Sequence, residues 1–295
     1  MDITRRLDAS RDAVLRRVGD AEEYIAGICF KTGPPGLVGI ELEWTVHHLD
    51  DPGRPLDPVV LAGALHPHTP STLDESSDHL PLPSGNVITV EPGGQVEIST
   101  QPYATLAALN AAVSADVEHL RALLARAGLR LGDRGADAYR PPRRLLHTPR
   151  YDAMASAFAP YDPHGRTMMC STAALQVCFD AGVPERVPAR WFALHALGPV
   201  LLALFANSGR HAGKDTGWAS TRMRSWLGLD PARTAPVRGD GGDGGAADAR
   251  RPRLPPEHPV PAGTPARVRR GALPRPAGAG RMARAGGRTD GVAHR

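Results

Sequence analysis

Two short acidic stretches carry the side chains in this chain that are best suited to chemistry. Residues 39–44 read Gly-Ile-Glu-Leu-Glu-Trp, and residues 91–99 read Glu-Pro-Gly-Gly-Gln-Val-Glu-Ile-Ser. Hard divalent cations such as Mg²⁺ take oxygen ligands, so carboxylates from neighbouring strands suit them, above all when phosphates complete the coordination shell. An isolated Glu-x-Glu on a strand is more often a solvated surface. Two acidic strands, one of them beside a Gly-Gly turn, favour a metal site instead.

Alternation along the predicted strands places these acidic side chains on one face. Residues 37–47 alternate apolar and polar side chains, which predicts a strand with both glutamates on its polar face. Residues 87–90 and 95–100 are expected to form two more strands around the Pro-Gly-Gly turn, and residues 172–180 alternate in the same way. The polar face is predicted to carry Glu41, Glu43, Gln95, Glu97, Ser99, Thr172 and Gln176.

Helices are predicted to flank these strands. Residues 105–127 have the clearest helical spacing of apolar side chains, and Thr105 is the expected cap at their start. Further helices are expected at residues 10–30, 55–65 and 188–206, with an irregular loop over residues 67–85. Such a pattern predicts an α+β fold in which helices cover only the apolar face of the sheet. The polar face is then free for chemistry.

Composition excludes several classes of protein. The 295 residues, 41% of them hydrophobic, are enough to build a buried core. Cys29, Cys170 and Cys178 show neither the spacing of a zinc site nor a disulfide framework, which fits a reducing cytoplasm. The first residues lack the apolar core of a signal peptide, and no segment is expected to be long enough to span a bilayer. We therefore predict a cytoplasmic protein with no membrane partner.

Residues 238–295 differ sharply in composition from the rest of the chain. They are dominated by Arg, Gly, Ala and Pro and contain no Ile, Phe, Tyr or Trp, which leaves too little to build a core. We predict a folded domain over residues 1–237 and a disordered tail over 238–295. The break at Val237 is typical of translation in a second reading frame of GC-rich DNA, and a basic tail for an acidic partner is the alternative. Its arginines lack aromatic neighbours that would stack on bases, so no nucleic-acid partner is expected.

A later part of the chain supplies further polar groups. Residues 168–180 add a hydroxyl and an amide to the polar face, although a half-buried strand with methionine as core filler explains them equally. Residues 206–226 are rich in hydrogen-bonding side chains. An arginine there is suited to bidentate contact with carboxylate or phosphate, and an arginine lying over a surface tryptophan is the alternative.

Five motifs in this order carry a family resemblance. They are residues 39–43, 91–99, 168–177, 206–208 and 220–226. Together they resemble the plant and proteobacterial type of glutamate–cysteine ligase, most closely the actinobacterial branch associated with ergothioneine synthesis. The resemblance runs from about residue 21 to Val237. It implies a glutamine-synthetase-like fold, whose curved antiparallel sheet forms a bowl for ATP, Mg²⁺ and glutamate.

The resemblance also implies a reaction and a role for each site residue. In such ligases ATP phosphorylates the γ-carboxylate of glutamate, and the amine of cysteine then attacks the acyl phosphate to give γ-glutamylcysteine. Glu41, Glu43 and Glu97 are expected to hold Mg²⁺, and Arg222 is expected to be the catalytic group that offsets carboxylate or phosphoryl charge. The expected substrate-binding residues are Gln95, Met168, Thr172, Gln176 and Arg222. No protein nucleophile is needed, so Cys170 and Cys178 are predicted to be packing residues.

Some residues depart from the family pattern. Position 178 is Cys where many relatives carry Asn, and Gly209 stands where Pro is common. Nothing after Val237 matches the strands and basic residues with which the family continues, so we expect the C-terminal part of the fold to be missing and the domain over 1–237 to be incomplete. Two alternatives therefore stay open: a related ligase with another acceptor amine, and an inactive truncated remnant. The oligomeric state is not predicted.

Overall fold

The computed structural model describes residues 36–230, together with Gly19 and Thr234. Three features of the sequence analysis lie outside the described residues: Cys29, the tail over 238–295 and, except for Gly19, the predicted helix over residues 10–30. The described elements in chain order are β1 (Val38–Trp44), β2 (Val46–His48), α3 (Pro58–Leu65), β3 (Val87–Val90), β4 (Val96–Ser99), α4 (Leu106–Arg126), β5 (Leu129–Leu131), α5 (Pro149–Phe158), η1 (Ala159–Tyr161), α6 (His164–Ser171), β6 (Leu175–Phe179), η2 (Pro184–Arg186), α7 (Val187–Phe205), β7 (Arg210–His211), β8 (Lys214–Asp215) and α8 (Thr221–Leu227).

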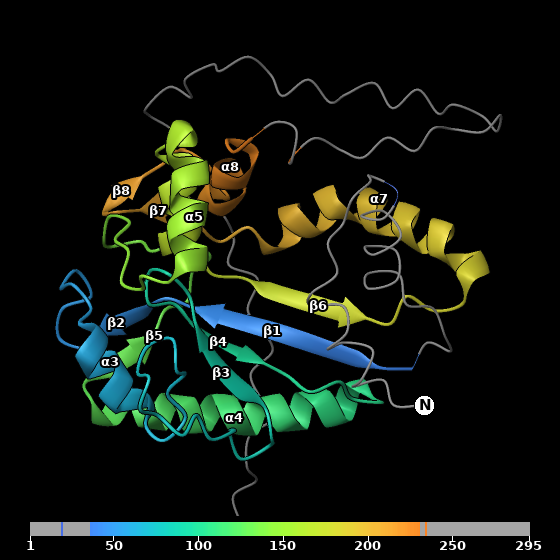
Figure 1. Cartoon of the computed structure of the whole chain (residues 1–295). Helices are drawn as coiled ribbons and strands as arrows, with labels where there is room; N and C mark the ends of the chain where they lie inside the picture. Colours follow the sequence, from blue (N-terminus) through green and yellow to red (C-terminus); the bar gives the residue numbers. More distant parts are fainter. Residues whose placement is uncertain (1–18, 20–35, 231–233, 235–295) are drawn as a thin grey trace, which may run out of the picture. The chain divides into compact units, whose positions relative to one another are not determined.

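The main sheet has four antiparallel strands in the order β3-β4-β1-β6, so the α+β prediction is confirmed (Figure 1). β1 lies in the centre and pairs with β4 on one side and with β6 on the other. Its partners come from sequence positions about 55 and 135 residues away, as in the pairs of Glu41 with Ser99 and with Gln176. The three predicted polar strand faces therefore form one continuous surface.

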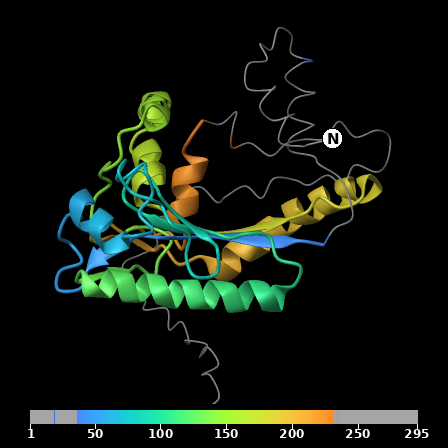
Figure 2. The same ribbon diagram turned by 60° about the horizontal axis from the view of Figure 1, so that its bottom comes forward.

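Helix α4 covers the apolar face of this sheet, as predicted (Figure 1 and Figure 2). Its side chains at Leu109, Leu120 and Leu124 recur at helical spacing and are buried in the same core as Ile98 of β4. The helix begins where the Thr105 hydroxyl accepts a hydrogen bond from the backbone N of Ala108 at 3.1 Å. Burial of one apolar stripe thus fixes α4 against the side of the sheet that carries no carboxylates.

The predicted strand over residues 37–47 is divided into two. β1 ends at Trp44, and β2 leaves the main sheet to pair with β5. Thr45 between them is buried, and a Cβ added to Gly132 would lie 2.2 Å from the Thr45 hydroxyl, so the two segments touch at backbone distance. The prediction of a single strand over residues 37–47 was therefore wrong beyond Trp44. The close contact of Thr45 with Gly132 falls where the chain leaves the main sheet.

Helices also lie over one end of the polar face, which the sequence did not predict. Figure 2 shows α8 on the opposite side of the sheet from α4. Gln95, just before β4, donates from its Nε2 to the backbone O of Met169 in α6, so α6 also lies on that side. The prediction that helices cover only the apolar face was wrong here. Helices α6 and α8 thus lie on the polar side of the sheet, and α6 contacts it next to the start of β4.

Helix α7 is as apolar as predicted but has no buried residue. Phe192, Leu204 and Phe205 are each between 69% and 75% exposed. Together with η2, residues Pro184–Phe205 are long and apolar enough to cross a bilayer, which corrects the expectation that no segment reaches that length. Helices that bury themselves against other protein share this length and composition.

A buried amide–carboxylate pair ties α4 to the strand edge and gives a test of this packing. Asn86 and Asp116 are fully buried; Asn86 Nδ2 donates to Asp116 at 2.7 Å, and Asn86 Oδ1 accepts from the backbone N of Gln101 at 2.8 Å. We predict that Asn86→Ala lowers the free energy of unfolding by about 2–3 kcal/mol, because a buried carboxylate and a backbone N–H lose partners. Urea denaturation measures this change. The exposed Asn110→Ala on α4 is the matched control, and an equal loss in both variants would contradict the prediction.

Candidate active site

The acidic side chains predicted to share a face do so in the structure. Glu43 on β1 lies directly opposite Glu97 on β4, and Glu41 lies opposite Ser99. Like charges directly opposite each other on neighbouring strands destabilise a sheet unless something offsets them. A positively charged group on the polar face at β1 and β4 would therefore reduce the repulsion between these carboxylates.

Neighbouring strands hold two of these carboxylates in place. Glu97 is buried, and its Oε1 accepts hydrogen bonds from the hydroxyls of Thr89 at 2.8 Å and Ser99 at 2.7 Å. Glu41 accepts from Nε2 of Gln176 on β6 at 2.7 Å. Glu97 is thus oriented by Thr89 on β3 and by Ser99 on its own strand, and Glu41 by Gln176 on β6.

Glu43 feels the crowding of charge most strongly. Burial, followed by the repulsion of Glu97 and Glu91, raises its pKa to about 7, and Arg222 acts in the opposite direction. A carboxyl group with a pKa in this range is half protonated at neutral pH. Glu43 is therefore poised to lose its proton when a cation arrives.

Glu91 is a fourth acid at this site that the sequence-based assignment left out. Burial and then the charge of Glu97 raise its pKa, while Arg150 and a hydrogen bond from Tyr151 lower it. Glu91 follows β3 two residues after Thr89, whose hydroxyl binds Glu97, so alternation along the strand was the signal that would have found it. The Glu91–Ser99 stretch contributes two carboxylates rather than one.

Arg222 brings a cation to the acidic face from a distant part of the chain. It lies in the first turn of α8, which begins where the Ser220 hydroxyl accepts from the backbone N of Met223 at 3.1 Å, and its own backbone N donates to the Ser208 hydroxyl at 3.2 Å. Burial lowers the pKa of Arg222, and the charge of Glu43 raises it. Its buried Nε has no hydrogen-bond partner among the described residues. An unsatisfied buried guanidinium nitrogen beside carboxylates fits an anionic ligand.

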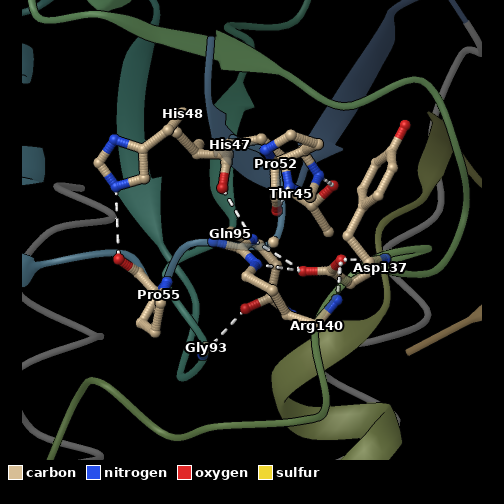
Figure 3. Close-up of polar contacts among 12 residues, drawn as sticks. Thr45, His47, His48, Pro52, Pro55, Gly93, Gln95, Asp137 and Arg140 are labelled. Atoms are coloured by element: carbon tan, nitrogen blue, oxygen red, sulfur yellow. Dashed lines mark hydrogen bonds and ion pairs between the residues drawn. The ribbon is translucent and has the colours of Figure 1, made fainter. Parts of the chain in front are cut away.

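Gln95 holds the end of α6 rather than facing the open surface. Its Nε2 donates to the backbone O of Thr172 at 2.9 Å, and its Oε1 accepts from the backbone N of Gly93 at 2.9 Å (Figure 3). A Cβ at Gly93 would lie 2.1 Å from the backbone O of Cys170, so only glycine allows this approach. The structure therefore gives Gln95 the position of a residue that sets where α6 ends.

The other predicted substrate residues are divided between the surface and the interior. Gln176 is exposed on β6 beside Glu41, and Arg222 lies near Glu43. Met168 in α6 is half-buried, and Thr172 is buried just after α6, where its hydroxyl donates to the backbone O of Met168 at 2.7 Å. Thr172 was expected on a strand with Gln176; it lies before β6 begins.

A loop after β5 joins the segments that surround the site. Asp137 pairs with Arg140 at 2.7 Å, and Arg140 donates to the backbone O of Val46 at 2.8 Å (Figure 3). The backbone N of Asp137 donates to Ser171 O at the end of α6, and His211 binds Asp137 O. Burial lowers the pKa of His47 beside this ion pair, so the neutral imidazole is favoured. β2, α6 and the β7 strand are thus fixed to one another.

Two cavities lie near these elements, and the smaller one adjoins the acids. A cavity of about 210 Å³ is lined by Glu41, Ser99 and Cys178. A larger one of about 380 Å³ lies beside α5 and α6, but its arginines Arg144 and Arg166 are paired with aspartates at 2.5 and 2.6 Å. The buried side-chain atom without a partner in the described part of the chain, Nε of Arg222, lies instead near Glu43.

The acids fit Mg²⁺ with phosphate better than a metal held by protein alone. Within residues 36–230, no three His, Cys, Asp or Glu side chains form a ready metal cage. Mg²⁺ is commonly bound through one or two carboxylates, with waters and substrate phosphates filling the other positions. A row of carboxylates beside an arginine whose buried Nε lacks a partner among the described residues matches that kind of site.

Of the two described cysteines, Cys170 lacks the environment of a nucleophile. Cys170 is buried, and burial raises the pKa of its thiol to about 11, so the reactive thiolate is scarce at neutral pH. Its packing role agrees with the prediction. Cys178 is instead exposed on β6, which corrects the expectation that it packs in the core.

The raised pKa of Glu43 predicts how stability depends on pH in the absence of divalent metal. The folded state keeps a proton on Glu43 that the unfolded state has lost between pH 4.5 and about 7, so the free energy of unfolding should fall as pH rises through that window. Glu43→Gln should flatten this part of the profile. Chemical denaturation in EDTA across the window measures it, with the exposed Glu75→Gln as control. An unchanged slope in Glu43→Gln would contradict the assignment.

Comparison with known proteins places these features in a family. A family profile described as glutamate-cysteine ligase family 2 (GCS2) matches residues 37–249. The chain is 41% identical over 225 residues to a glutamate–cysteine ligase EgtA of Mycobacterium tuberculosis, covering 76% of this chain and 50% of the relative. It is 40% identical to EgtA of Mycolicibacterium smegmatis, covering 77% of this chain and 52% of the relative. It is 32% identical to a chloroplastic glutamate–cysteine ligase of Brassica juncea, covering 50% of this chain and 29% of the relative.

These matches agree with the resemblance found in the sequence motifs, including its bacterial branch. The chain spans about half the length of the bacterial relatives. The family profile extends past Val237, where the composition changes. Because that profile covers most of the chain, the chain belongs to glutamate–cysteine ligase family 2.

Proposed function

We propose that this chain carries the acidic face of a ligase that joins the γ-carboxylate of glutamate to the amine of cysteine at the expense of ATP. The observation that carries the proposal is the row of Glu41, Glu43 and Glu97 on one sheet face, with Arg222 near Glu43 and its buried Nε without a partner among the described residues. The similarity to enzymes named glutamate–cysteine ligase supplies the substrates. The product is γ-glutamylcysteine, and its use in ergothioneine synthesis follows the mycobacterial branch that the motifs resemble.

The acids and the arginine have different tasks in this proposal. Glu41, Glu43 and Glu97 would hold Mg²⁺, which when bound neutralises the charge of the ATP phosphates. Because Glu97 and Glu41 are already oriented by hydrogen bonds from polar side chains of the sheet, these two carboxylates need little reorganisation on binding. Glu43 must give up its proton, and the positive charges drive that loss.

Arg222 and the amide side chains would position glutamate. The γ-carboxylate attacks the terminal phosphorus of ATP, ADP leaves, and the amine of cysteine then replaces phosphate to form the amide. Arg222 offsets the negative charge of the carboxylate and the transferring phosphoryl group. Gln176 lies at the open side of the face, while Gln95 sets the position of Met168 and Thr172 by holding the end of α6. Catalysis is then positioning and charge neutralisation, which requires no covalent enzyme intermediate.

The finer features of the fold are part of the same proposal. We infer a glutamine-synthetase-like curved sheet, which the antiparallel order of β3, β4, β1 and β6 supports. A related ligase with a different acceptor amine and an inactive remnant are the alternatives. Activity measured on this chain decides between them.

The first test is substrate-dependent release of ADP. We predict Mg²⁺-dependent ADP release that requires glutamate and cysteine together. We also predict a loss of at least roughly 100-fold in kcat for Glu97→Gln, because the buried carboxylate opposite Glu43 is neutralised. A coupled ADP assay with a panel of amino acids measures this, with Glu75→Gln as control. No stimulation by the two amino acids would remove the proposed reaction, and stimulation by another amine would select the other acceptor.

The second test separates the geometry of Arg222 from its charge. Arg222→Lys keeps the positive charge but loses the planar fork, so we predict a fall in kcat/KM for glutamate of roughly tenfold or more. Arg224→Lys is the matched control two residues away, because Arg224 is exposed and lies over the ring of Trp218 at 5.4 Å. Equal effects of the two substitutions on ligase kinetics would show that Arg222 has no special part.

A further inference from the structure

Two histidines from distant parts of the chain meet at α4, the helix that covers the apolar face of the sheet. His68 lies in the loop after α3, and His119 lies in α4, 51 residues further along the chain. Their Nε2 atoms are 3.2 Å apart, and their rings stand at 82° to each other. His68 is 7% exposed, and His119 is half-buried. The proposed ligation reaction uses neither residue.

A backbone carbonyl fixes which nitrogen of His68 carries the proton. Nδ1 of His68 lies 2.9 Å from the backbone O of Leu80. A carbonyl oxygen only accepts hydrogen bonds, so Nδ1 is the donor, and Nε2 of the neutral imidazole presents its lone pair to His119. Metal-binding histidines share this arrangement, in which the second ring nitrogen donates to a carbonyl and so orients the ring. His68 thus has the tautomer and the support of a metal ligand.

The spacing of the two Nε2 atoms suits a tetrahedral metal ion. Bonds between Zn²⁺ and imidazole nitrogen are about 2.0–2.1 Å long, so two of them at the tetrahedral angle place the nitrogens roughly 3.3 Å apart. The observed separation is 3.2 Å. This distance also permits an N–H···N hydrogen bond, which holds the pair together without metal. A metal ion would take the place of the shared proton, and His119 would then carry its proton on Nδ1.

Water, rather than a further side chain, would complete the coordination shell. Within residues 36–230, no three His, Cys, Asp or Glu side chains are placed to hold an ion. Asp116, about one turn before His119 on α4, is already engaged, because its carboxylate accepts from the backbone N of Ser84 at 3.0 Å and from Nδ2 of Asn86 at 2.7 Å. Two imidazoles with water favour metals that prefer nitrogen, such as Zn²⁺, over Mg²⁺, which prefers oxygen.

We propose that His68 and His119 form a binding site for a divalent cation of the Zn²⁺ class, separate from the acidic face. The ion joins the loop over residues 67–85 to α4. The backbone N of Leu80 donates to the backbone O of Pro67 at 3.1 Å, so the loop is already closed beside His68, and its ring needs little movement. Because the unfolded chain does not hold the two histidines together, a bound ion favours the folded state.

Zinc titration tests the proposal. The parent chain carries Glu43→Gln and Glu97→Gln, which remove the acidic face as a competing site. Isothermal titration calorimetry should show one Zn²⁺ ion bound per chain, and the Tm should rise with micromolar Zn²⁺ but not with Mg²⁺. His119→Gln keeps an N–H for Nε2 of His68 but loses the imidazole. It should weaken Zn²⁺ binding at least roughly tenfold, since losing even an outer partner of a metal ligand costs that much.

The matched control is His195→Gln, because His195 is exposed on α7 and makes its hydrogen bond within that helix, to the backbone O of Trp191. Circular dichroism checks that each variant is folded. Nitrogen NMR of the histidine rings needs no histidine variant: Zn²⁺ should shift the Nε2 resonances of His68 and His119, while Nδ1 of His68 keeps its proton.

Several results would overturn the proposal. They are the absence of Zn²⁺ binding, an affinity unchanged by His119→Gln, an equal loss of affinity in His195→Gln, and NMR shifts confined to other histidines. Any of them would leave His68 and His119 as a hydrogen-bonded pair alone. None of these measurements requires ligase turnover, so the outcome is independent of the proposed reaction.

Discussion

The site depends on one unfavourable contact, the placement of Glu43 opposite Glu97 across β1 and β4. Two facing carboxylates in a partly buried position repel each other, and burial together with that repulsion raises the pKa of Glu43 to about 7. The fold keeps them together because apolar residues on the other face of the same strands are buried beneath α4. The hydrophobic core thus holds the two carboxylates together against their mutual repulsion. A bound cation would reduce that repulsion.

The parts that border the acids are fixed by contacts between distant segments. Gly93 lets the end of α6 approach the turn before β4, and Gln95 binds the two segments together. Asp137 connects the same end of α6 to β2 through Arg140. Arg222 reaches the acids because α8 is anchored at Ser208. These contacts are made between backbones and buried polar groups, so a ligand meets a prepared surface rather than a flexible one.

Local patterns predicted the features that depend on periodicity. Alternation placed Glu41, Glu43 and Glu97 on one face, and helical spacing with a capping threonine located α4 closely. The division of the first strand at Thr45, the start of β6 after Thr172 and the covering of the polar face by α6 depend on contacts across the chain, which one sequence does not display. Glu91 was missed although strand alternation pointed to it. Sequence resemblance, rather than local pattern, supplied the substrates and the choice of Arg222.

The central claim is that the acidic face binds a divalent cation, and binding of Mn²⁺ tests it most directly, because Mn²⁺ also prefers oxygen ligands and free Mn²⁺ has a strong electron paramagnetic resonance signal. With a non-hydrolysable ATP analogue present to supply phosphate ligands, titration of the wild-type protein with millimolar Mn²⁺ should reduce the free-ion signal below that of the analogue alone, and addition of Mg²⁺ should restore it. The double variant Glu43→Gln, Glu97→Gln should leave the signal as it is with the analogue alone. An unchanged signal with the wild-type protein, or an equal reduction with the double variant, would contradict the account.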